Sequence, residues 1–298
     1  MVLESATYTA FEAKRAEAAT SGRWIGLGIA SYNEDTGLPP YEGATVKVLP
    51  SGRIAVELGS CAQGQGLETI AAQIAADQFD VDPQEVIVKT GDTAFNAIAL
   101  STVGSRVAST AGPSVHLAAT QVREKALRLA AQQLEAAEED LEITRGAVNI
   151  KGVADRKVTL SELAKRLISN VNVPLPNGFT PGLEATAYHT PSRPVYANGS
   201  NVAEVEVDVE TGAVTLLDYR VAHDCGTLIN PMLVEGQIVG GVVHGIGNAL
   251  YEHMKYDAES GQPVTTNFGD YLLPIATEIP PIRLQHMESP SPLNPLGV

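Results

Sequence analysis

The amino-acid sequence predicts an α+β protein built from hairpin–helix units. Residues 44–60 and residues 201–221 alternate apolar and polar side chains on both sides of a turn, which is the pattern of a β-hairpin. Each hairpin runs into a glycine-rich segment and then into a stretch with the apolar spacing of a helix face. The two units share this plan but not their residues, so we expect either a pseudo-repeat or a recurring α+β element.

Length, composition and charge limit the class of protein. The chain has 298 residues, of which 44% are hydrophobic, as in a globular protein with one large domain or two ordinary ones. A net charge of −15 and a pI near 4.8 argue against nucleic acid or an anionic membrane surface as the partner, because both require a basic patch. The first residues are charged, and no run approaches the roughly 20 apolar residues of a membrane span. We therefore expect a soluble, cytoplasmic protein.

The cysteines and histidines predict no metal site made by the protein itself. The two cysteines, Cys61 and Cys225, lie far apart, so they support neither a disulfide framework nor a cysteine-rich zinc site. A four-cysteine iron–sulfur cluster cannot be built from this chain, so electrons from any redox reaction must leave through another chain. His223, Asp224 and His244 are too irregularly spaced for a metal site, and ordinary hydrogen-bonded roles are expected for them.

The elements of the first unit follow in order. Residues 7–19 predict a short polar helix, within a linker or surface element over residues 1–21. Residues 22–170 make the first α+β unit, in which the hairpin is followed by a helix from Leu67 and by a strand within residues 83–93. Its remaining elements are a helix, a small hairpin and a helix with a capping box, at residues 115–141, 141–150 and 159–167.

A loop separates this unit from the second one. Residues 171–194 are rich in Pro, Gly and Asn, which marks a loop or an internal boundary, and residues 195–298 make the second α+β unit. In its helix, Asn230 and Pro231 have the residue types of an N-cap and a first helical position. Five glycines follow, each costing about 1 kcal/mol relative to alanine. We expect something to pack closely here, either another backbone or a cofactor against Gln237.

The glutamines and glycines of residues 61–66 are the first candidate site. Glycine lets a backbone approach a ligand closely, and the free amides of a helix start bind anions. A glutamine side chain carries a carbonyl and an amide, which suits a flat heterocycle with donors and acceptors. The alternative is a tight strand-to-helix turn with glutamines facing solvent. The motif alone leaves both interpretations open.

The small, hydroxyl-rich run of residues 101–114 is the second candidate site. It precedes a predicted helix, so its hydroxyls are of the type that caps a helix start. A cradle for phosphate is the alternative interpretation of the same residues.

Five motifs in one order carry a resemblance to a known family. They are CAQGQGLET, STVGSR, DCGTLINPMLVEGQIVGGVVHGIGNALYE, FGDYLLP and ESPSPLNPLGV. Together they resemble the C-terminal half of the molybdopterin-binding subunit of the xanthine dehydrogenase and aldehyde oxidase family, and within it most closely the large chains of aerobic carbon monoxide dehydrogenases. The resemblance extends from about Gly22 to the end of the chain.

The resemblance implies a cofactor site. It implies the fold of the molybdenum-cofactor-binding domains of molybdenum hydroxylases and a molybdopterin cytosine dinucleotide cofactor, whose pterin dithiolene holds the molybdenum, so that no metal ligand from the protein is expected. Gln237 is expected near the pterin. The residues expected along the rest of the cofactor are Gln63, Gly64, Gln65, Gly66, Thr102, Gly104, Ser105 and Arg106.

The resemblance also implies an oxidoreductase that works in a complex. The expected reaction is hydroxylation of a substrate C–H bond with oxygen from water, or oxidation of carbon monoxide. Electrons are expected to pass to a [2Fe–2S] cluster on a small subunit and to FAD on a medium subunit. The expected partners include the N-terminal half of the molybdenum subunit, which supplies much of the site for a small-molecule substrate.

One departure from the family concerns the catalytic base. In the family, the SPLNPLGV segment continues into a glycine-rich turn with the general-base glutamate, whereas this sequence ends at Val298. The catalytic residue is therefore expected beyond the chain, and the chain alone is expected to be inactive. A partial sequence, a naturally split subunit and a degenerate paralogue each explain this, and a partial sequence is favoured. A rival hypothesis is a non-catalytic scaffold or assembly subunit that keeps the fold.

Overall fold

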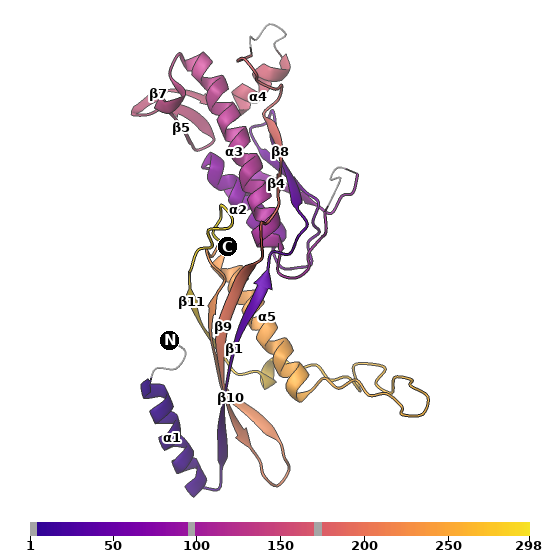
Figure 1. Ribbon diagram of the computed structural model, residues 1–298. Coiled ribbons are helices and arrows are strands. Elements are labelled where there is room, and N and C mark those ends of the chain that lie inside the picture. Colours follow the sequence, from indigo (N-terminus) through magenta and orange to yellow (C-terminus); the bar gives the residue numbers. More distant parts are fainter. Residues whose placement is uncertain (1–4, 95–98, 170–174) are drawn as a thin grey trace. The chain divides into compact units, whose positions relative to one another are not determined.

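The computed structural model describes residues 5–94, 99–169 and 175–298 and confirms the α+β class (Figure 1). Contacts divide the chain into two units. We call residues 1–34 and 197–289 the terminal unit, and residues 35–196 and 290–298 the central unit. These bounds differ from those that composition predicts, because strand pairing joins the start of the chain to residues beyond the middle.

A four-stranded sheet forms the base of the central unit. Its strands are ordered β4-β3-β2-β8. The predicted hairpin is confirmed, since β2 and β3 pair antiparallel, while β4 runs parallel to β3 and β8 runs antiparallel to β2. The bounds of the four strands are Glu42–Val48 for β2, Ile54–Leu58 for β3, Val86–Thr90 for β4 and Glu184–His189 for β8.

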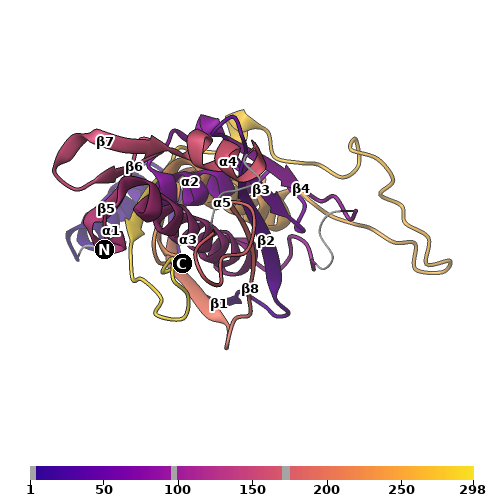
Figure 2. The ribbon, with the colours of Figure 1, turned by 90° about the horizontal axis from the view of Figure 1, so that it is seen from above.

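Two helices pack side by side on this sheet, as Figure 2 shows from above. Helix α2, Leu67–Phe79, has the predicted start. Helix α3, Val107–Leu134, begins eight positions before the predicted residue 115 and runs through Pro113. From the sequence alone, the Gly-Pro pair at 112–113 would be expected to interrupt a helix. In the structure, the small residues around this pair are buried. A Cβ on Gly112 would lie 2.9 Å from Leu296 and 3.4 Å from Ile74, so the helix packs tightly at this point.

A small sheet and a capped helix complete the central unit. Strands β5, β6 and β7 span Leu141–Thr144, Ala147–Ile150 and Val153–Thr159, so the predicted small hairpin is confirmed. Helix α4, Leu160–Ser169, starts with the predicted capping box: Thr159 N donates to Glu162 Oε2 at 2.8 Å, and Glu162 N donates to Thr159 Oγ1 at 3.2 Å. Three-residue 3₁₀ helices, η1 and η2, lie at Pro83–Glu85 and Glu138–Asp140.

The terminal unit consists of a second sheet with two helices. The sheet is ordered β1-β9-β10-β11, and β9 and β10 form the predicted hairpin. The strands span Trp24–Thr36 for β1, Val195–Val207 for β9, Val214–Asp224 for β10 and Ile282–Met287 for β11. Helix α1, Ser5–Thr20, confirms the predicted N-terminal helix. Helix α5, Pro231–Leu250, packs on the sheet around Val221, Val242 and Ile246.

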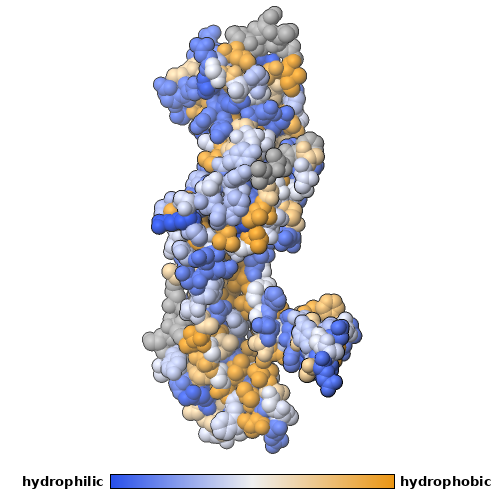
Figure 3. Space-filling view, turned by 45° about the vertical axis from the view of Figure 1, so that its right-hand side comes forward, coloured by the Kyte–Doolittle hydropathy of each residue, from blue (hydrophilic) through white to orange (hydrophobic). Residues whose placement is uncertain are grey.

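The surface mixes hydrophilic and apolar patches, as the face in Figure 3 shows.

The segment between α5 and β11 has no helix or strand except the 3₁₀ helix η3, Ala276–Glu278, and an isolated bridge. Several of its large apolar side chains are exposed: Tyr256, Val264, Phe268, Leu272, Leu273 and Ile275. Within the described ranges, no helix has both the length and the apolar character needed to cross a membrane.

Candidate functional site

The turn of residues 61–66 leads from β3 into helix α2. Gly64 and Gly66 adopt positive φ values of 93° and 84°, which glycine reaches without strain. Gln65 Oε1 accepts a hydrogen bond from Gln63 N at 2.7 Å and closes the turn. Gly66 is the N-cap of α2, and no side chain caps this helix start. A Cβ on Gly64 would meet no atom within 4 Å, so the backbone of this turn is open on one side.

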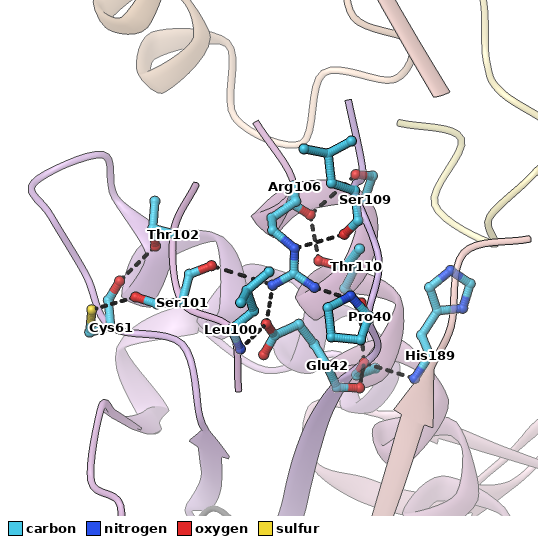
Figure 4. A network of polar contacts seen from close by, with 12 residues as sticks. Pro40, Glu42, Cys61, Leu100, Ser101, Thr102, Arg106, Ser109, Thr110 and His189 are labelled. Atoms are coloured by element: carbon cyan, nitrogen blue, oxygen red, sulfur yellow. Dashed lines mark hydrogen bonds and ion pairs between the residues drawn. The ribbon is translucent and has the colours of Figure 1, made fainter. Parts of the chain in front are cut away.

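The structure brings the second candidate segment against this turn (Figure 4). Gln65 Nε2 donates to Thr102 Oγ1 at 3.0 Å, and Thr102 Oγ1 donates to Cys61 O at 2.7 Å. The Sγ of Cys61 lies 2.9 Å from Ser101 Oγ. Two segments that are 40 residues apart in the sequence therefore form one hydrogen-bonded surface.

The hydroxyls of the second segment do not cap helix α3. Its N-cap is Arg106, and no side chain bonds to the first amides of the helix. The hydroxyls of Ser109 and Thr110 instead donate to Arg106 O at 3.2 and 2.6 Å, from within the helix. The capping prediction is therefore wrong, because α3 begins in the middle of the hydroxyl-rich run. Both α2 and α3 present helix starts without a side-chain cap.

Arg106 lies inside the protein. Its side chain is 0% exposed and pairs with Glu42, which is 1% exposed. The guanidinium also donates to Leu38 O at 2.8 Å, to Pro40 O at 2.6 Å and to Ser101 O at 3.3 Å. With its donors used in this way, Arg106 offers no exposed surface to a ligand. The structure does not support the expectation that its side chain contacts the cofactor, and points to a structural role.

Glu42 is the residue of this site that the sequence analysis missed. It stands at the start of β2, and its Oε1 accepts a hydrogen bond from Leu100 N at 3.1 Å. Its other oxygen, Oε2, is buried without a hydrogen-bond partner. No local pattern marks this glutamate, because its partner lies 64 positions away in the chain. Burial of a charge next to an apolar strand is visible only in the folded protein.

Gln237 belongs to the terminal unit, where it is exposed on α5. The N-cap prediction for this helix is confirmed, since Asn230 Oδ1 accepts from Leu233 N at 3.1 Å. A Cβ placed on any of four of its glycines would meet no atom within 4 Å; these glycines are Gly236, Gly240, Gly241 and Gly245. Among the described residues of the terminal unit, no other backbone therefore packs closely against these four positions. Within the central unit, a hydrogen bond joins the segments around Gln65 and Thr102.

His223 and Asp224 have hydrogen-bonded roles, as expected. The Nδ1 of His223 lies 2.5 Å from the hydroxyl of Tyr32, and burial, together with the nearby His286, lowers the pKa of His223. Asp224 Oδ1 accepts from Gly226 N at 3.0 Å and from Ser289 N at 3.1 Å. In the described part of the chain, no three His, Cys, Asp or Glu side chains are placed to hold a metal ion.

Comparison with known proteins places this chain in a family. The family model of the molybdopterin cofactor-binding domain matches residues 1–280. The chain is 38% identical over 307 residues to the nicotine 6-hydroxylase large subunit of Paenarthrobacter nicotinovorans, covering 99% of this chain and 37% of that protein. It is 34% identical over 284 residues to the carbon monoxide dehydrogenase large chain of Afipia carboxidovorans, covering 92% of this chain and 34% of that protein.

A solved structure agrees with these relatives. Quinoline 2-oxidoreductase from Pseudomonas putida 86 is similar with a TM-score of 0.91 and 39% identity, over 100% of this chain and 39% of that one. The chain thus spans less than two fifths of the length of each of these three proteins. The match of the family model over most of the chain and the identity to these relatives show that the chain belongs to the molybdopterin cofactor-binding domain family.

Proposed function

We propose that this chain is the cofactor-holding portion of a molybdenum hydroxylase and binds molybdopterin in its cytosine dinucleotide form. The observation that carries the proposal is the hydrogen bond between Gln65 and Thr102, which joins two loops that each lead into a helix start. The first amides of a helix are donors without a partner in the helix, and they favour anions. Two such starts beside one another suit the phosphates of a dinucleotide.

The residues present fit such a cofactor. Gly64 leaves one side of the turn open, so a flat group could approach the backbone without meeting a side chain. Gln63 and Ser105 are exposed, and Gly104 beside Ser105 has a φ of 57°. We assign Gln63, Gly64, Ser105 and the first amides of α2 and α3 as the contacts that hold the cofactor, with Gln65, Gly66, Thr102 and Gly104 shaping the loops. Gln237 is assigned to the pterin region.

The proposed reaction is the hydroxylation of a substrate C–H bond with oxygen from water. When bound, the cofactor supplies a molybdenum centre for this two-electron oxidation. The nicotine hydroxylase subunit and the quinoline oxidoreductase are each more than 35% identical to this chain, whereas the carbon monoxide dehydrogenase chain is 34% identical. We therefore propose a small organic substrate and keep carbon monoxide as the alternative.

The proposed protein works as part of a complex in the cytoplasm. One relative is the gamma subunit of a dehydrogenase complex, and others are large subunits or large chains. With two cysteines, this chain cannot hold a four-cysteine cluster. We therefore propose a small subunit with a [2Fe–2S] cluster and a medium subunit with FAD as partners. The N-terminal half of the molybdenum subunit is proposed to complete the substrate site.

The substitution Gln65→Ala tests the proposed site. It removes the bond to Thr102 and the bond from Gln63 N. We expect the retained molybdenum and pterin to fall on the order of tenfold, since each neutral hydrogen bond contributes about 1 kcal/mol. Metal analysis by mass spectrometry and pterin fluorescence on the isolated complex measure both. Gln132→Ala, at an exposed position of α3, is the matched control and should retain the cofactor. Equal cofactor content in both variants would contradict the assignment.

A further inference from the structure

We propose that the buried ion pair between Glu42 and Arg106 positions residues 100–106 against the turn of residues 61–66. This inference rests on the proposed function and adds two positioning residues to the same site. Neither residue is proposed to touch the cofactor. Their role is to fix the relative position of the two loops that do.

The first argument is that the pair is fully enclosed. Arg106 is 0% and Glu42 is 1% exposed, and the two side chains are in contact through Nη1 and Oε1. Arg106 also donates to the carbonyls of Leu38 and Pro40, which belong to the segment leading into β2. A buried charge is costly unless its partners stay in place. The pair therefore tolerates little displacement of either segment.

The second argument is that both members of the pair hold the same loop. Glu42 Oε1 accepts from Leu100 N at 3.1 Å, and Arg106 Nη1 donates to Ser101 O at 3.3 Å (Figure 4). The pair thus fixes the two residues that come directly before Thr102. Because Thr102 is the residue that bonds to the glutamine turn, a shift of this loop would break the junction between the two cofactor loops.

The third argument is the backbone conformation of the loop. Ser101 and Ser105 have φ values of 83° and 52°, in the left-handed region that side chains other than glycine rarely adopt. Such residues persist where the surrounding structure over-determines them, and they cluster at functional sites. The carbonyl of Ser101 is itself an acceptor of Arg106. The ion pair is therefore in a position to hold the loop in a conformation that it would not keep alone.

Three variants separate positioning from general stability. Glu42→Ala removes the carboxylate and leaves the guanidinium unpaired. Glu42→Gln is the conservative variant, since it keeps an acceptor oxygen but loses the charge. Leu129→Ala is the matched control, because Leu129 is fully buried on α3 and makes no contact in this network. All variants are made in the complex in which the protein is isolated.

Hydrogen exchange is the most direct measurement. The amide of Leu100 is bonded to Glu42, so in Glu42→Ala its exchange should become faster on the order of tenfold to a hundredfold, as expected for loss of a hydrogen bond to a charged group. Glu42→Gln should show a smaller increase. The alkylation rate of Cys61, whose Sγ lies beside Ser101, should change in parallel, and molybdenum and pterin content should fall. Leu129→Ala should lower the thermal midpoint and leave exchange at residues 100–105, Cys61 alkylation and cofactor content unchanged.

Two results would overturn the inference. One is unchanged exchange at residues 100–105 in Glu42→Ala, or in Glu42→Gln if the alanine variant does not fold. The other is equal loss of cofactor in Leu129→Ala at the same decrease of the thermal midpoint, which would mean that the pair only stabilises the fold. If the unaltered protein holds no molybdenum and no pterin, the proposed function fails. Exchange and alkylation would still decide whether the pair positions the loop.

Discussion

At the scale of single residues, the side chain of Gln65 forms hydrogen bonds within the protein that hold the two loops of the candidate site together. In the sequence it looks like a free donor and acceptor, but in the structure its oxygen closes the turn at Gln63 and its nitrogen holds Thr102. A side-chain amide has two donor hydrogens and two acceptor lone pairs, so one of each remains for a ligand. The same residue therefore joins the loops and can still contribute to binding.

At the same scale, the lowered pKa of His223 leads us to expect that the stability of the protein depends on pH. Burial and the nearby His286 lower the pKa of His223, which in the unfolded chain is about 6.5, and Asp224 only partly opposes this. Between the lowered pKa of the folded protein and about 6.5, the unfolded chain therefore binds more protons than the folded one. The free energy of unfolding should be highest above pH 6.5 and should fall as the pH decreases, by at most about 1.4 kcal/mol per pH unit for this proton.

The variant His223→Gln tests this expectation. Its free energy of unfolding should depend less on pH between about 7 and 5.5 than that of the unaltered protein, as measured by urea unfolding. Gln262→Ala, which changes an exposed side chain of the same unit that carries no titratable group, is the control and should keep the original dependence. Burial lowers the pKa of His116 and of His189 in the central unit as well, so some dependence should remain. An identical slope in both variants would exclude His223 as a source.

At the scale of elements, helix α5 carries glycines that its own unit does not require. Nothing lies within 4 Å of a Cβ at Gly240, whereas at Gly247 a Cβ would lie 3.1 Å from the Cδ of Pro274. A glycine inside a helix lowers stability by about 1 kcal/mol relative to alanine. The open glycine face is thus costly for the chain alone, as expected if that face is kept free for a cofactor.

The substitution Gly240→Ala should therefore have two opposite effects. The free energy of unfolding should rise by about 1 kcal/mol, because alanine is the better helix former and has room. Cofactor content should fall, because the new methyl group occupies the open face. Urea unfolding and metal analysis measure the two effects. Gly247→Ala is the comparison on the same helix and should lower stability instead. Unchanged cofactor content in Gly240→Ala would contradict a role for this face.

The elements that the sequence predicts are those set by short-range patterns. The hairpin of β2 and β3 and helix α2 follow from alternation and from helical spacing within a few residues. The predicted start of α3 at residue 115 is wrong, because the small, hydroxyl-rich residues before it have the composition of a loop, and only the tight packing around Gly112 shows that they are helical. The pairing of β8 with β2 and the burial of Glu42 depend on contacts across long stretches of chain, which periodicity does not reveal.

The candidate site was predictable to a similar extent. Glutamines, glycines and hydroxyls at two helix starts marked both loops, and the order of motifs led to the family. The sequence did not show that Gln65 and Thr102 bond to each other, nor that Arg106 points inward to Glu42. These are tertiary contacts, and the residue types alone would have allowed each side chain to face solvent.

At the scale of the whole molecule, the chain corresponds to one part of its longer relatives. It belongs to the molybdopterin cofactor-binding domain family and matches the relatives compared over less than two fifths of their length. Its net charge is −15, and its described residues hold no cluster of His, Cys, Asp or Glu for a metal ion. The function proposed above, in which an organic cofactor brings the metal and other subunits take the electrons, concerns the longer protein of which the relatives are examples.

The most direct test of this account is the molybdenum and pterin content of the protein. We would isolate the chain alone and together with the products of its neighbouring genes, under conditions of adequate cofactor supply. Mass spectrometry measures the metal, and fluorescence of the oxidised pterin measures the organic part. The account predicts molybdenum and pterin in equal amounts in the co-expressed complex. Absence of both from that complex would contradict it and would favour a scaffold that keeps the fold without the cofactor.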